Sequence, residues 1–453
     1  MEGKNVILIF DIGKTNKKVL LFDESYQVVY EKSVSLPEIT DEDGDPCESL
    51  TSLQNFVKES VDEVFHLAQF TIKAINFSAY GASFVYINTS GKTVTHLYNY
   101  LKPYPSALQK RFYRYYGDEE IFSLETASPV LGSLNSGLQL YRLKYEQPRI
   151  FENCWQALHL PQFLSFLIAE NVCSEITSIG CHTGMWNFGK DDYHAWVYEE
   201  GIAEKLPSLV TANTVYPVTI NHHSVLVGTG LHDSSAALVP YLEQFKEPFL
   251  LLSTGTWCIS LNPFNVTPLT IEELRNDCLC YISYEGKPVK AARLFAGYEH
   301  EIQVKRLAQH FEKPSDYYQK ISLNDKLLPK EGIEKYYESF SELDLASFAD
   351  YETAYHCLLH FIVFAQSKSI RLVLNDTSVK RIFVEGGFSK NNLFMNLLSR
   401  QFSGLEVYAA SMPQASAMGA ALVIHSSWND KPIPETLVHL DTSATINSQV
   451  SSQ

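Results

Sequence analysis

The chain has 453 residues, with 36 Lys and Arg against 52 Asp and Glu, so its formal net charge is −16. A hydrophobic share of 45% and a charged share of 19% exclude a disordered chain, and the length predicts roughly two or three domains. The acidity argues against a broad surface for nucleic acid or for an anionic membrane, since either needs clustered Lys and Arg. It leaves room for a local site that binds an anion through backbone N–H groups.

The cysteines and the apolar runs point to a reducing compartment. The eight cysteines form no C-x-x-C pair and are too sparse for a disulfide scaffold. No signal peptide is predicted, because the apolar run at residues 6–10 is short and ends in Asp11. We also expect no membrane span, since no apolar stretch approaches the required length. These features predict a cytoplasmic protein.

The first half of the chain predicts a β-hairpin, a third strand, a helix and a fourth strand. The buried strands appear as continuous apolar runs, and the helix as apolar residues three and four positions apart. A polar turn with one glycine, residues 11–18, joins the first two strands, and the fourth strand enters a loop at Tyr80 and Gly81. The predicted strands are residues 6–10, 19–22, 27–31 and 72–78, and the predicted helix is residues 53–68.

The same order of elements recurs in the second half. Two strands flank the polar turn 253–256, a long helix follows, and a later strand enters a glycine loop at residues 385–387. This repetition predicts two duplicated α/β domains that face each other across a cleft. We place the domains at residues 1–225 and 226–440, and expect residues 441–453, rich in Ser, Thr, Asn and Gln, to form a disordered tail. The predicted strands are residues 248–252, 257–261 and 379–384, and the predicted helix is residues 358–372.

Gly13, Lys14 and Thr15 suggest a Walker A phosphate loop, but that pattern fails. It needs a glycine at position 8, which is Leu8, and a helix after the loop, where this chain continues into a strand. The N–H groups and hydroxyls of a hairpin turn can still bind phosphate. Residues 253–256 form the matching turn of the second half. Either turn by itself predicts only a turn, whereas two at equivalent positions would hold a polyphosphate from both sides.

A glycine-rich turn at residues 228–230 leads to His232 and Asp233, where a helix is predicted to begin. The structural interpretation makes Asp233 an N-cap and His232 a hydrogen-bonded structural histidine. The functional interpretation makes Asp233 a general base, a role that typically contributes about 10²–10⁴-fold in rate. The residues by themselves leave both interpretations open.

Gly386 and Gly387 lie between a predicted strand and a predicted helix that begins near residue 392. Paired glycines at such a turn let a flat ring lie against the backbone, although the dinucleotide fingerprint G-x-G-x-x-G is absent. Residues 414–421 predict a helix faced with small residues that can pack close to this loop. Tight helix packing would explain the same small residues.

These segments, in this order and at this spacing, resemble the FGGY family of carbohydrate kinases, which belongs to the actin/Hsp70/hexokinase superfamily. The resemblance covers residues 5–425 and is nearest to the rhamnulokinases and related deoxyketose kinases, which share His-Asp-Ser-Ser-Ala and Gly-Thr-Trp. Residues 11–18 resemble the first phosphate motif, 253–257 the second, 385–391 with 413–421 the adenosine motif, and 230–233 the segment of the catalytic aspartate.

The resemblance implies an α/β fold of two facing ribonuclease H-like, actin-like ATPase domains with a central cleft. It implies ATP-dependent phosphorylation of a sugar hydroxyl, with ATP and Mg²⁺ as cofactors and a deoxyketose such as L-rhamnulose as the first candidate. Asp233 would be the catalytic base, and Asp11 and Asp233 would hold the metal. The implied ATP-binding residues are Gly13, Thr15, Asn16, Lys18, Gly255, Thr256, Gly386, Gly387 and Asn391, and the implied substrate-binding residues are Tyr80, Gly81, Ser83, His232 and Asp233.

Three departures from the family pattern concern the sugar pocket. Residues 98–102 lack the acid of an Asp/Arg segment, Ser83 stands where rhamnulokinases carry aspartate, and residues 177–182 replace a more polar stretch. Because a site that reads hydroxyls rejects the wrong sugar strongly, these changes leave the sugar open. L-fuculose, xylulose, ribulose or another ketose or polyol are alternative substrates, and a non-catalytic nucleotide-binding sugar sensor is the alternative from another class.

Several side chains could serve either a site or the fold. Lys14, Lys17 and Lys18 put three basic residues in the first phosphate turn, an exception to the acidic composition. A homodimer is one candidate for the oligomeric state, beside the small-molecule partners sugar and ATP. The aromatic residues that could stack on a sugar, or simply pack, are Tyr80, Tyr98, Tyr100 and Trp186.

Overall fold

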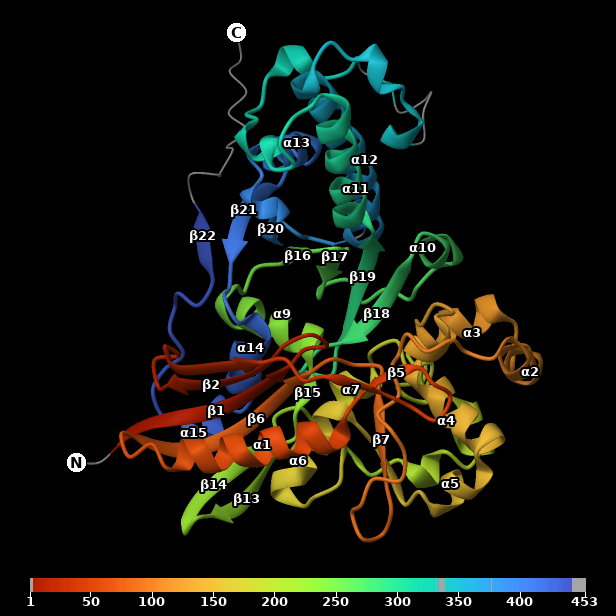
Figure 1. Ribbon diagram of the computed structural model, residues 1–453, viewed down its shortest axis with the longest axis vertical. Coiled ribbons are helices and arrows are strands. Elements are labelled where there is room, and N and C mark those ends of the chain that lie inside the picture. Colours follow the sequence, from red (N-terminus) through yellow and green to blue (C-terminus); the bar gives the residue numbers. More distant parts are fainter. Residues whose placement is uncertain (1–2, 331, 334–338, 376, 442–453) are drawn as a thin grey trace.

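The structure is a computed structural model that describes residues 3–330, 332–333, 339–375 and 377–441. Two domains follow one another along the long axis of the molecule, and each contains one seven-stranded sheet (Figure 1). The predicted disordered tail lies outside the described residues, except for Asp441, which ends the last strand.

The first sheet has the order β13-β14-β6-β1-β2-β3. The short β15 also pairs with β6, nearer its C-terminal end than β14 does. The strands β1, β2 and β3 pair antiparallel, β6 lies parallel to β1, and β14 lies parallel to β6. The bounds are β1 (Lys4–Ile12), β2 (Lys17–Asp23), β3 (Val28–Val34), β6 (Phe70–Ala79), β13 (Val215–Ile220), β14 (His223–Gly228) and β15 (Leu231–His232).

The second sheet has the order β18-β19-β17-β16-β20-β21-β22. Its strands β19, β17 and β16 pair antiparallel, β20 lies parallel to β16, and β21 lies parallel to β20. The bounds are β16 (Phe249–Thr254), β17 (Cys258–Asn262), β18 (Cys278–Ile282), β19 (Pro288–Leu294), β20 (Arg381–Gly386), β21 (Glu406–Ser411) and β22 (His439–Asp441).

The two sheets repeat one topology, as the sequence predicted. In each, three antiparallel strands (β3, β2 and β1 in the first, β19, β17 and β16 in the second) are followed by two parallel strands, and an antiparallel edge strand lies beside the last of these. The second sheet adds β18, which pairs antiparallel with β19. The duplicated α/β fold is therefore confirmed. The domain boundary between residues 225 and 226 remains a proposal, and it falls inside β14 of the first sheet.

The remaining strands form four two-stranded sheets, and fifteen helices surround the sheets in the described part of the chain. The paired strands are β4 (Glu38–Thr40) with β5 (Pro46–Glu48), β7 (Phe84–Ile87) with β8 (Gln156–His159), β9 (Ser174–Glu175) with β12 (Leu209–Val210), and β10 (Trp186–Asn187) with β11 (Asp192–Tyr193). The helices are α1 (Leu50–Phe65), α2 (Ser106–Tyr116), α3 (Glu119–Thr126), α4 (Ser136–Glu146), α5 (Pro148–Asn153), α6 (Leu160–Ala169), α7 (Ile176–Ile179), α8 (Ala195–Glu199), α9 (Asp233–Gln244), α10 (Ile271–Arg275), α11 (Ala296–His310), α12 (Tyr351–Leu374), α13 (Asn392–Gln401), α14 (Ala415–Val423) and α15 (His425–Trp428).

The helices α9 and α14 pack against each other between the two sheets (Figure 1). Residues of α14 belong to the same buried cluster as Ile7 and Ile9 of β1, so the helix that follows the second sheet covers the first one. Leu238 and Tyr241 of α9 belong to the cluster of Phe249 and other residues of the second sheet. Each helix thus lies in the other half's core, and together they join the domains.

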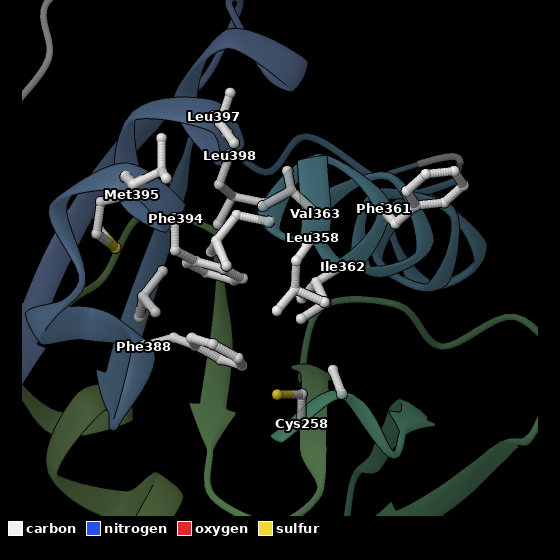
Figure 2. Close-up of a cluster of buried hydrophobic side chains, with 14 of the residues drawn as sticks. Cys258, Leu358, Phe361, Ile362, Val363, Phe388, Phe394, Met395, Leu397 and Leu398 are labelled. Atoms are coloured by element: carbon white, nitrogen blue, oxygen red, sulfur yellow. The ribbon is translucent and has the colours of Figure 1, made fainter. Parts of the chain in front are cut away.

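The core of the second domain lies between its sheet and the helices α12 and α13 (Figure 2). Phe388 and Phe394 stack with ring centroids 4.3 Å apart, and Leu358 and Ile362 of α12 face the same cluster. By length and composition α12 could also cross a membrane, although no membrane span was expected from the sequence. Of its most apolar window, 61% is buried inside the structure, as in the core helix of a folded domain, so this is weak evidence for a span.

Gly419→Ala tests the contact between α9 and α14. A Cβ at Gly419 would collide with the main-chain carbonyl of Ala236, which cannot rotate away as a side chain could. Alanine favours a helix interior by about 1 kcal/mol over glycine. We expect the forced backbone shift to outweigh that gain and to lower the free energy of unfolding by about 1–3 kcal/mol.

Urea denaturation measures this effect, and Gly404→Ala is the matched control. Gly404 is exposed, with no heavy atom within 4 Å of its Cβ position, so its substitution should change stability by only a few tenths of a kcal/mol, the range of about ±0.5 kcal/mol usual at surfaces. A stabilised Gly419→Ala protein would show that the two helices can separate at no cost.

Candidate active site

The first phosphate turn is a tight connection between β1 and β2. The N–H of Gly13 donates to the carbonyl of Asn16 at 3.0 Å, and Thr15 and Asn16 are exposed. Lys17 departs from the expectation of a basic turn, because its side chain is only 1% exposed. It points into the protein, where Nζ lies 2.9 Å from Glu48 and donates to the carbonyls of Gly13 and Lys14. Lys17 therefore holds the turn from its buried side.

The N-terminal end of α14 meets this turn from the second domain. The hydroxyl of Ser416 donates to Oδ1 of Asp11 at 2.9 Å, and Lys18 Nζ donates to the side chain of Gln414 at 2.8 Å. Burial, with a smaller contribution from the charge of Asp233, raises the pKa of Asp11 to about 6. The charges of Asp233 and Lys18 therefore both act on the carboxyl group of Asp11, in opposite directions.

The second phosphate turn is supported by the start of α11. Gly255 and Thr256 are exposed, and the N–H of Tyr298 donates to the carbonyl of Thr256 at 3.1 Å. A side chain at Gly297 would collide with the carbonyl of Gly255. The absence of a Cβ at Gly297 is thus what lets α11 lie against the turn. No pattern in the sequence singled out Gly297.

A cavity of about 590 Å³ lies in the second domain, beside the paired glycines. Gly386 has φ +86° and no room for a Cβ beside the carbonyl of Thr254, so only glycine fits there. Asn391 caps α13 through its side-chain oxygen and donates to the hydroxyl of Tyr355 at 2.8 Å. The cavity is lined by Thr254, Gly255, Gly297, His300, Tyr318, Gln319, Ile321, Ser322, Gly387, Phe388, Lys390, Asn391 and Asn392.

This cavity has the size and lining of a small-molecule site. Its volume lies in the range of roughly 300–1,000 Å³ that is typical of small-molecule sites. The aromatic rings of His300 and Tyr318, which pack edge to face 5.0 Å apart, supply flat apolar surface, and the glycine loop supplies backbone groups. Of the predicted ATP-binding residues, Gly255, Gly387 and Asn391 line it. Gly13, Thr15, Asn16 and Lys18 belong to the other domain and do not.

Asp233 is the first residue of α9 and follows β15 directly. Its Oδ1 accepts from the N–H of Ser234 at 2.7 Å and lies 3.2 Å from Nε2 of His232. The side chain remains 35% exposed. Burial of its surroundings nevertheless raises the pKa of Asp233 to about 6, because protein encloses most directions around the carboxyl group. Its contacts fit both the N-terminal helix position and a group that can take up a proton.

His232 is buried, and both of its ring nitrogens have polar neighbours. Nδ1 lies 3.3 Å from the hydroxyl of Ser235, which donates to the carbonyl of Ile282 at 3.1 Å. Nε2 lies 3.1 Å from Sγ of Cys181 and 3.2 Å from Oδ1 of Asp233. Either nitrogen can carry the single proton of the neutral ring.

Three neutral histidines, His159, His182 and His232, lie within electrostatic reach of one another through His232. Burial lowers the pKa of His159, His182 and His232 to about 3 in each case, and the charge of His232 would oppose protonation of the other two. His159 stacks on Phe84 with ring centroids 3.9 Å apart and lies 3.0 Å from the hydroxyl of Ser136. These rings contribute polar atoms without a charge.

Asp11 and Asp233 form a pair that a divalent cation fits. Both carboxyl groups have raised pKa values, and the charge of Asp233 raises that of Asp11 further. Mg²⁺ prefers carboxylate and water oxygens, and a bound cation would offset this repulsion. The donor set is therefore the right one for Mg²⁺.

The predicted sugar-binding residues surround His232 and Asp233. A Cβ at Gly81 would come within 2.8 Å of the His232 ring, so the two segments touch. Tyr80 packs edge to face on Tyr100 at 5.9 Å, and burial, together with the charge of Asp233, raises the pKa of Tyr100. Ser83 is buried and donates to the carbonyl of Tyr98 at 3.4 Å. These contacts place Gly81 against His232, Tyr100 within electrostatic reach of Asp233, and Tyr80 against Tyr100.

Trp186 and the Tyr98 hydroxyl have other surroundings. Trp186 is buried against Tyr193 in a separate apolar cluster, so it serves packing. The hydroxyl of Tyr98 donates to Glu42, beside a network of charged side chains on another loop. Of the four candidate stacking residues, Tyr100 lies within electrostatic reach of Asp233, and Tyr80 packs against Tyr100.

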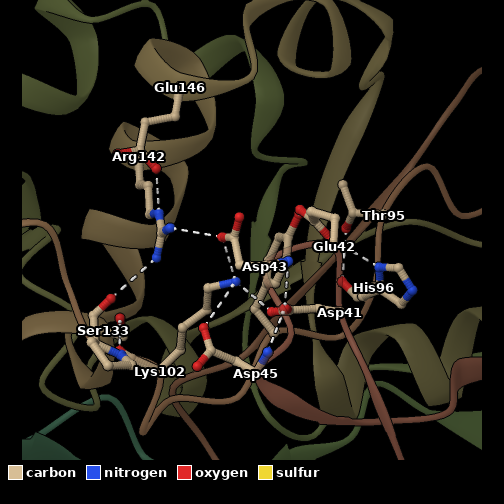
Figure 3. A network of polar contacts seen from close by, with 12 residues as sticks. Asp41, Glu42, Asp43, Asp45, Thr95, His96, Lys102, Ser133, Arg142 and Glu146 are labelled. Carbon is tan, nitrogen blue, oxygen red and sulfur yellow. Dashed lines mark hydrogen bonds and ion pairs between the residues drawn. The ribbon is translucent and has the colours of Figure 1, made fainter.

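That network contains an acidic cluster that the sequence did not flag (Figure 3). Carboxylate oxygens of Asp41, Asp43 and Asp45 lie close enough together to hold a metal ion. However, the ammonium group of Lys102 lies among them, 2.8 Å from Asp43 and 3.4 Å from Asp45, and also pairs with Asp41. Arg142 pairs with Asp43 at 3.0 Å. The cluster already has its cations and lies apart from the candidate active site.

The comparisons with known proteins agree with this geometry. The family model described as the FGGY family of carbohydrate kinases, N-terminal domain, matches residues 6–239. The model described as carbohydrate kinase FGGY, C-terminal domain, matches residues 246–432. A comparison with curated protein sequences gives no match.

Solved structures of similar fold include a carbohydrate kinase from Novosphingobium aromaticivorans, at 21% identity and a TM-score of 0.78 over 98% of this chain and 96% of that one. A xylulose kinase from Lactobacillus acidophilus has 14% identity and a TM-score of 0.78, over 96% and 93%. A gluconate kinase from the same organism has 14% identity and a TM-score of 0.77, over 97% and 93%. At these identities the likeness concerns the fold.

His159→Gln tests the neutral state of the buried histidines. A histidine with a folded pKa near 3 and an unfolded pKa near 6.5 takes up a proton on unfolding between these values. Its stabilising contribution is therefore complete above pH 6.5 and is lost as the pH falls toward 3. Each such group adds about 1.4 kcal/mol per pH unit to the slope of stability between roughly pH 4 and 6. We expect the variant to lose one such increment.

Urea unfolding at pH 5 and pH 6 gives the slope for both proteins. Groups common to the two, including the raised carboxyl groups, cancel in the difference. Above pH 7.5 the slopes should agree, since the histidine is neutral in both states. An unchanged slope between pH 5 and 6 would mean that His159 is protonated in the folded protein.

Proposed function

The chain belongs to the FGGY family of carbohydrate kinases, and we propose that it transfers the γ-phosphoryl group of ATP to a hydroxyl of a ketose. A deoxyketose such as L-rhamnulose is the first candidate. The observation that carries the proposal is Asp233, a partly exposed carboxyl group of raised pKa at the start of α9, within electrostatic reach of Asp11. Enzymes of this family use ATP, generally with Mg²⁺.

Asp233 acts as the general base in this proposal. The sugar hydroxyl gives its proton to the carboxylate while its oxygen forms a bond to the γ-phosphorus, and the bond from phosphorus to the departing ADP oxygen breaks. The described contacts of Asp233 with Ser234 and His232 are to Oδ1, so we assign Oδ2 to the sugar hydroxyl. A base whose pKa lies near 6 is ionised at neutral pH and still has useful proton affinity.

The other residues bind and orient in this proposal. Asp11, with Asp233, holds Mg²⁺, which when bound neutralises the charge of the phosphates. Tyr80, Gly81, Ser83 and His232 contact the sugar. The residues assigned to the phosphates are Thr15, Asn16, Lys18 and Gly13 on one side and Gly255 and Thr256 on the other, and those assigned to the adenosine are Gly386, Gly387 and Asn391.

The neutral polar groups near Asp233 support a substrate read through hydroxyl groups. Uncharged histidines and a tyrosine can donate and accept hydrogen bonds but do not offer a fixed positive charge to an acid. The Gly-Thr-Trp and His-Asp-Ser-Ser-Ala segments favour L-rhamnulose among the ketoses. L-fuculose, xylulose and ribulose follow as alternatives. A homodimer and a cytoplasmic location stay predictions.

A substrate panel tests the proposal. ADP release from the purified protein would be measured with L-rhamnulose, L-fuculose, xylulose, ribulose, gluconate and glycerol, each with ATP and Mg²⁺. We expect the highest kcat/KM with a ketose. Preference for gluconate or glycerol would overturn the ketose assignment, and binding of ATP without turnover of any compound would favour the non-catalytic sensor.

Asp233→Asn tests the assigned base on the best substrate of the panel. We expect kcat to fall by about 10²–10⁴-fold, because the amide cannot take up the proton, while the Kd for ATP stays within about twofold. Asp62→Asn, an exposed position on α1, is the matched control and should keep full turnover. Full turnover in Asp233→Asn would show that another group is the base.

Asp11→Asn tests the metal assignment. Removing one carboxylate from the pair leaves a weaker oxygen donor of lower charge, so we expect the Mg²⁺ concentration for half-maximal rate to rise at least about tenfold. Titration of MgCl₂ at saturating ATP and sugar measures it. An unchanged Mg²⁺ dependence would remove Asp11 from the metal site.

A further inference from the structure

The buried carboxyl group of Glu175 is connected to β15 by hydrogen bonds through Thr177. Glu175, 0% exposed, ends β9 and caps the four-residue helix α7. Its Oε1 accepts from the N–H of Thr177 at 2.9 Å. Its Oε2 accepts from the N–H of Ser178 at 3.1 Å and from the hydroxyl of Thr177 at 2.7 Å. No described basic side chain forms an ion pair with it.

The direction of the next hydrogen bond follows from the first. The hydroxyl of Thr177 has one proton, and Glu175 accepts it. Its oxygen can then only accept, and it accepts from the main-chain N–H of His232 at 3.0 Å. The chain of donors therefore runs from His232 through Thr177 to Glu175, over residues that lie 55 and 2 positions apart in the sequence.

This N–H lies at the point where the first sheet ends and α9 begins. The strand β15 has only two residues, Leu231 and His232, and pairs with β6 on one side. On the other side Thr177 satisfies the His232 N–H that a neighbouring strand would otherwise take up. This peptide joins Leu231 to His232, so it lies one residue before the position from which the Asp233 carboxyl group leaves the backbone.

The far end of α7 is fixed as well. A side chain at Gly180 would collide with Ile282 of β18, so α7 lies directly against the second domain. Ile282 also accepts the hydrogen bond from Ser235. The short helix therefore bridges β18 and the end of β15, and a displacement of Thr177 would be transmitted to His232.

We propose that Glu175 and Thr177 are positioning residues for phosphoryl transfer, which hold Asp233 in place through the main-chain N–H of His232. The inference rests on the proposed role of Asp233 as the base. A simple helix cap needs no buried carboxylate, since Ser or Thr caps as well without the cost of removing a charge from water. Glutamate is long enough to reach both the N–H groups of α7 and the Thr177 hydroxyl that carries the bond onward.

Thr177→Val removes the hydroxyl at nearly constant volume, and Thr177→Ser restores it. The first measurement is hydrogen–deuterium exchange at the His232 amide of the free enzyme. The second is kcat and KM for ATP and for the best sugar of the panel. In Thr177→Val we expect the exchange rate at the His232 amide to rise about tenfold and kcat to fall about tenfold, with KM for ATP unchanged. A hydrogen bond of ordinary net strength corresponds to about that factor. Thr177→Ser should lie within about twofold of the wild type in both.

Thr183→Val is the matched control in the same segment. Thr183 is also buried, and its hydroxyl donates to the carbonyl of Ile179 and accepts from the N–H of Met185, without contact to β15. It should lose stability to a similar extent but keep the kcat and the His232 exchange of the wild type. If Thr177→Val does not fold, Glu175→Gln keeps the side-chain volume, removes one acceptor oxygen and should change both measurements in the same direction.

The outcomes separate the two proposals. Unchanged His232 exchange in Thr177→Val, faster exchange with normal kcat, or an equal loss of kcat in Thr183→Val would each overturn the positioning role. If the enzyme phosphorylates none of the sugars in the panel, the proposed function is overturned, and the positioning role with it. Faster exchange with reduced kcat and rescue by serine supports the proposal.

Discussion

The helices α9 and α14 approach so closely that Gly419 of one has room for nothing larger than hydrogen beside the carbonyl of Ala236 on the other. Each helix follows a parallel strand of its own sheet and packs into the core of the opposite one. Their N-terminal ends are therefore brought to the same region. One carries Asp233, and the other carries Ser416, which bonds Asp11. The close packing of small residues thus determines where the two halves of the site meet.

Burial is the largest influence on the pKa values of this region. It raises the pKa values of Asp11 and Asp233 and lowers those of three neighbouring histidines. The carboxyl groups are left ready for a proton or a cation, and the histidines are left neutral. The ion pairs of the same domain lie elsewhere, as between Lys17 and Glu48 beneath the first turn and around Lys102 on the outer loop. The positive charges of Lys17 and Lys102 are thus held in ion pairs with carboxylates.

Main-chain groups form much of the rest of the candidate site. The two phosphate turns have exposed residues at their tips, and the glycine loop after β20 lies beside a cavity of nucleotide size. Gly297 and Gly386 are each needed because the backbone of another segment occupies the space of their Cβ atoms. The main-chain N–H of His232 in β15, which donates to the hydroxyl of Thr177, is another example of a peptide group fixed by a distant segment. Side chains far from the reacting atoms therefore act by fixing peptide groups.

The sequence by itself determined the duplicated sheets, the two hairpin turns, the paired glycines and the start of α9 at Asp233. Those features are encoded locally, in apolar runs, helical spacing and turn residues, which act over a few neighbouring positions. Tertiary structure alone decided that Lys17 points inward while Lys18 meets Gln414, that His300 and Tyr318 line the cavity beside the paired glycines, and that Glu175 reaches His232 through Thr177. The partners in these contacts are separated by up to 396 positions. No local pattern reports such a separation, because it is the packing of helices and sheets that brings the partners together.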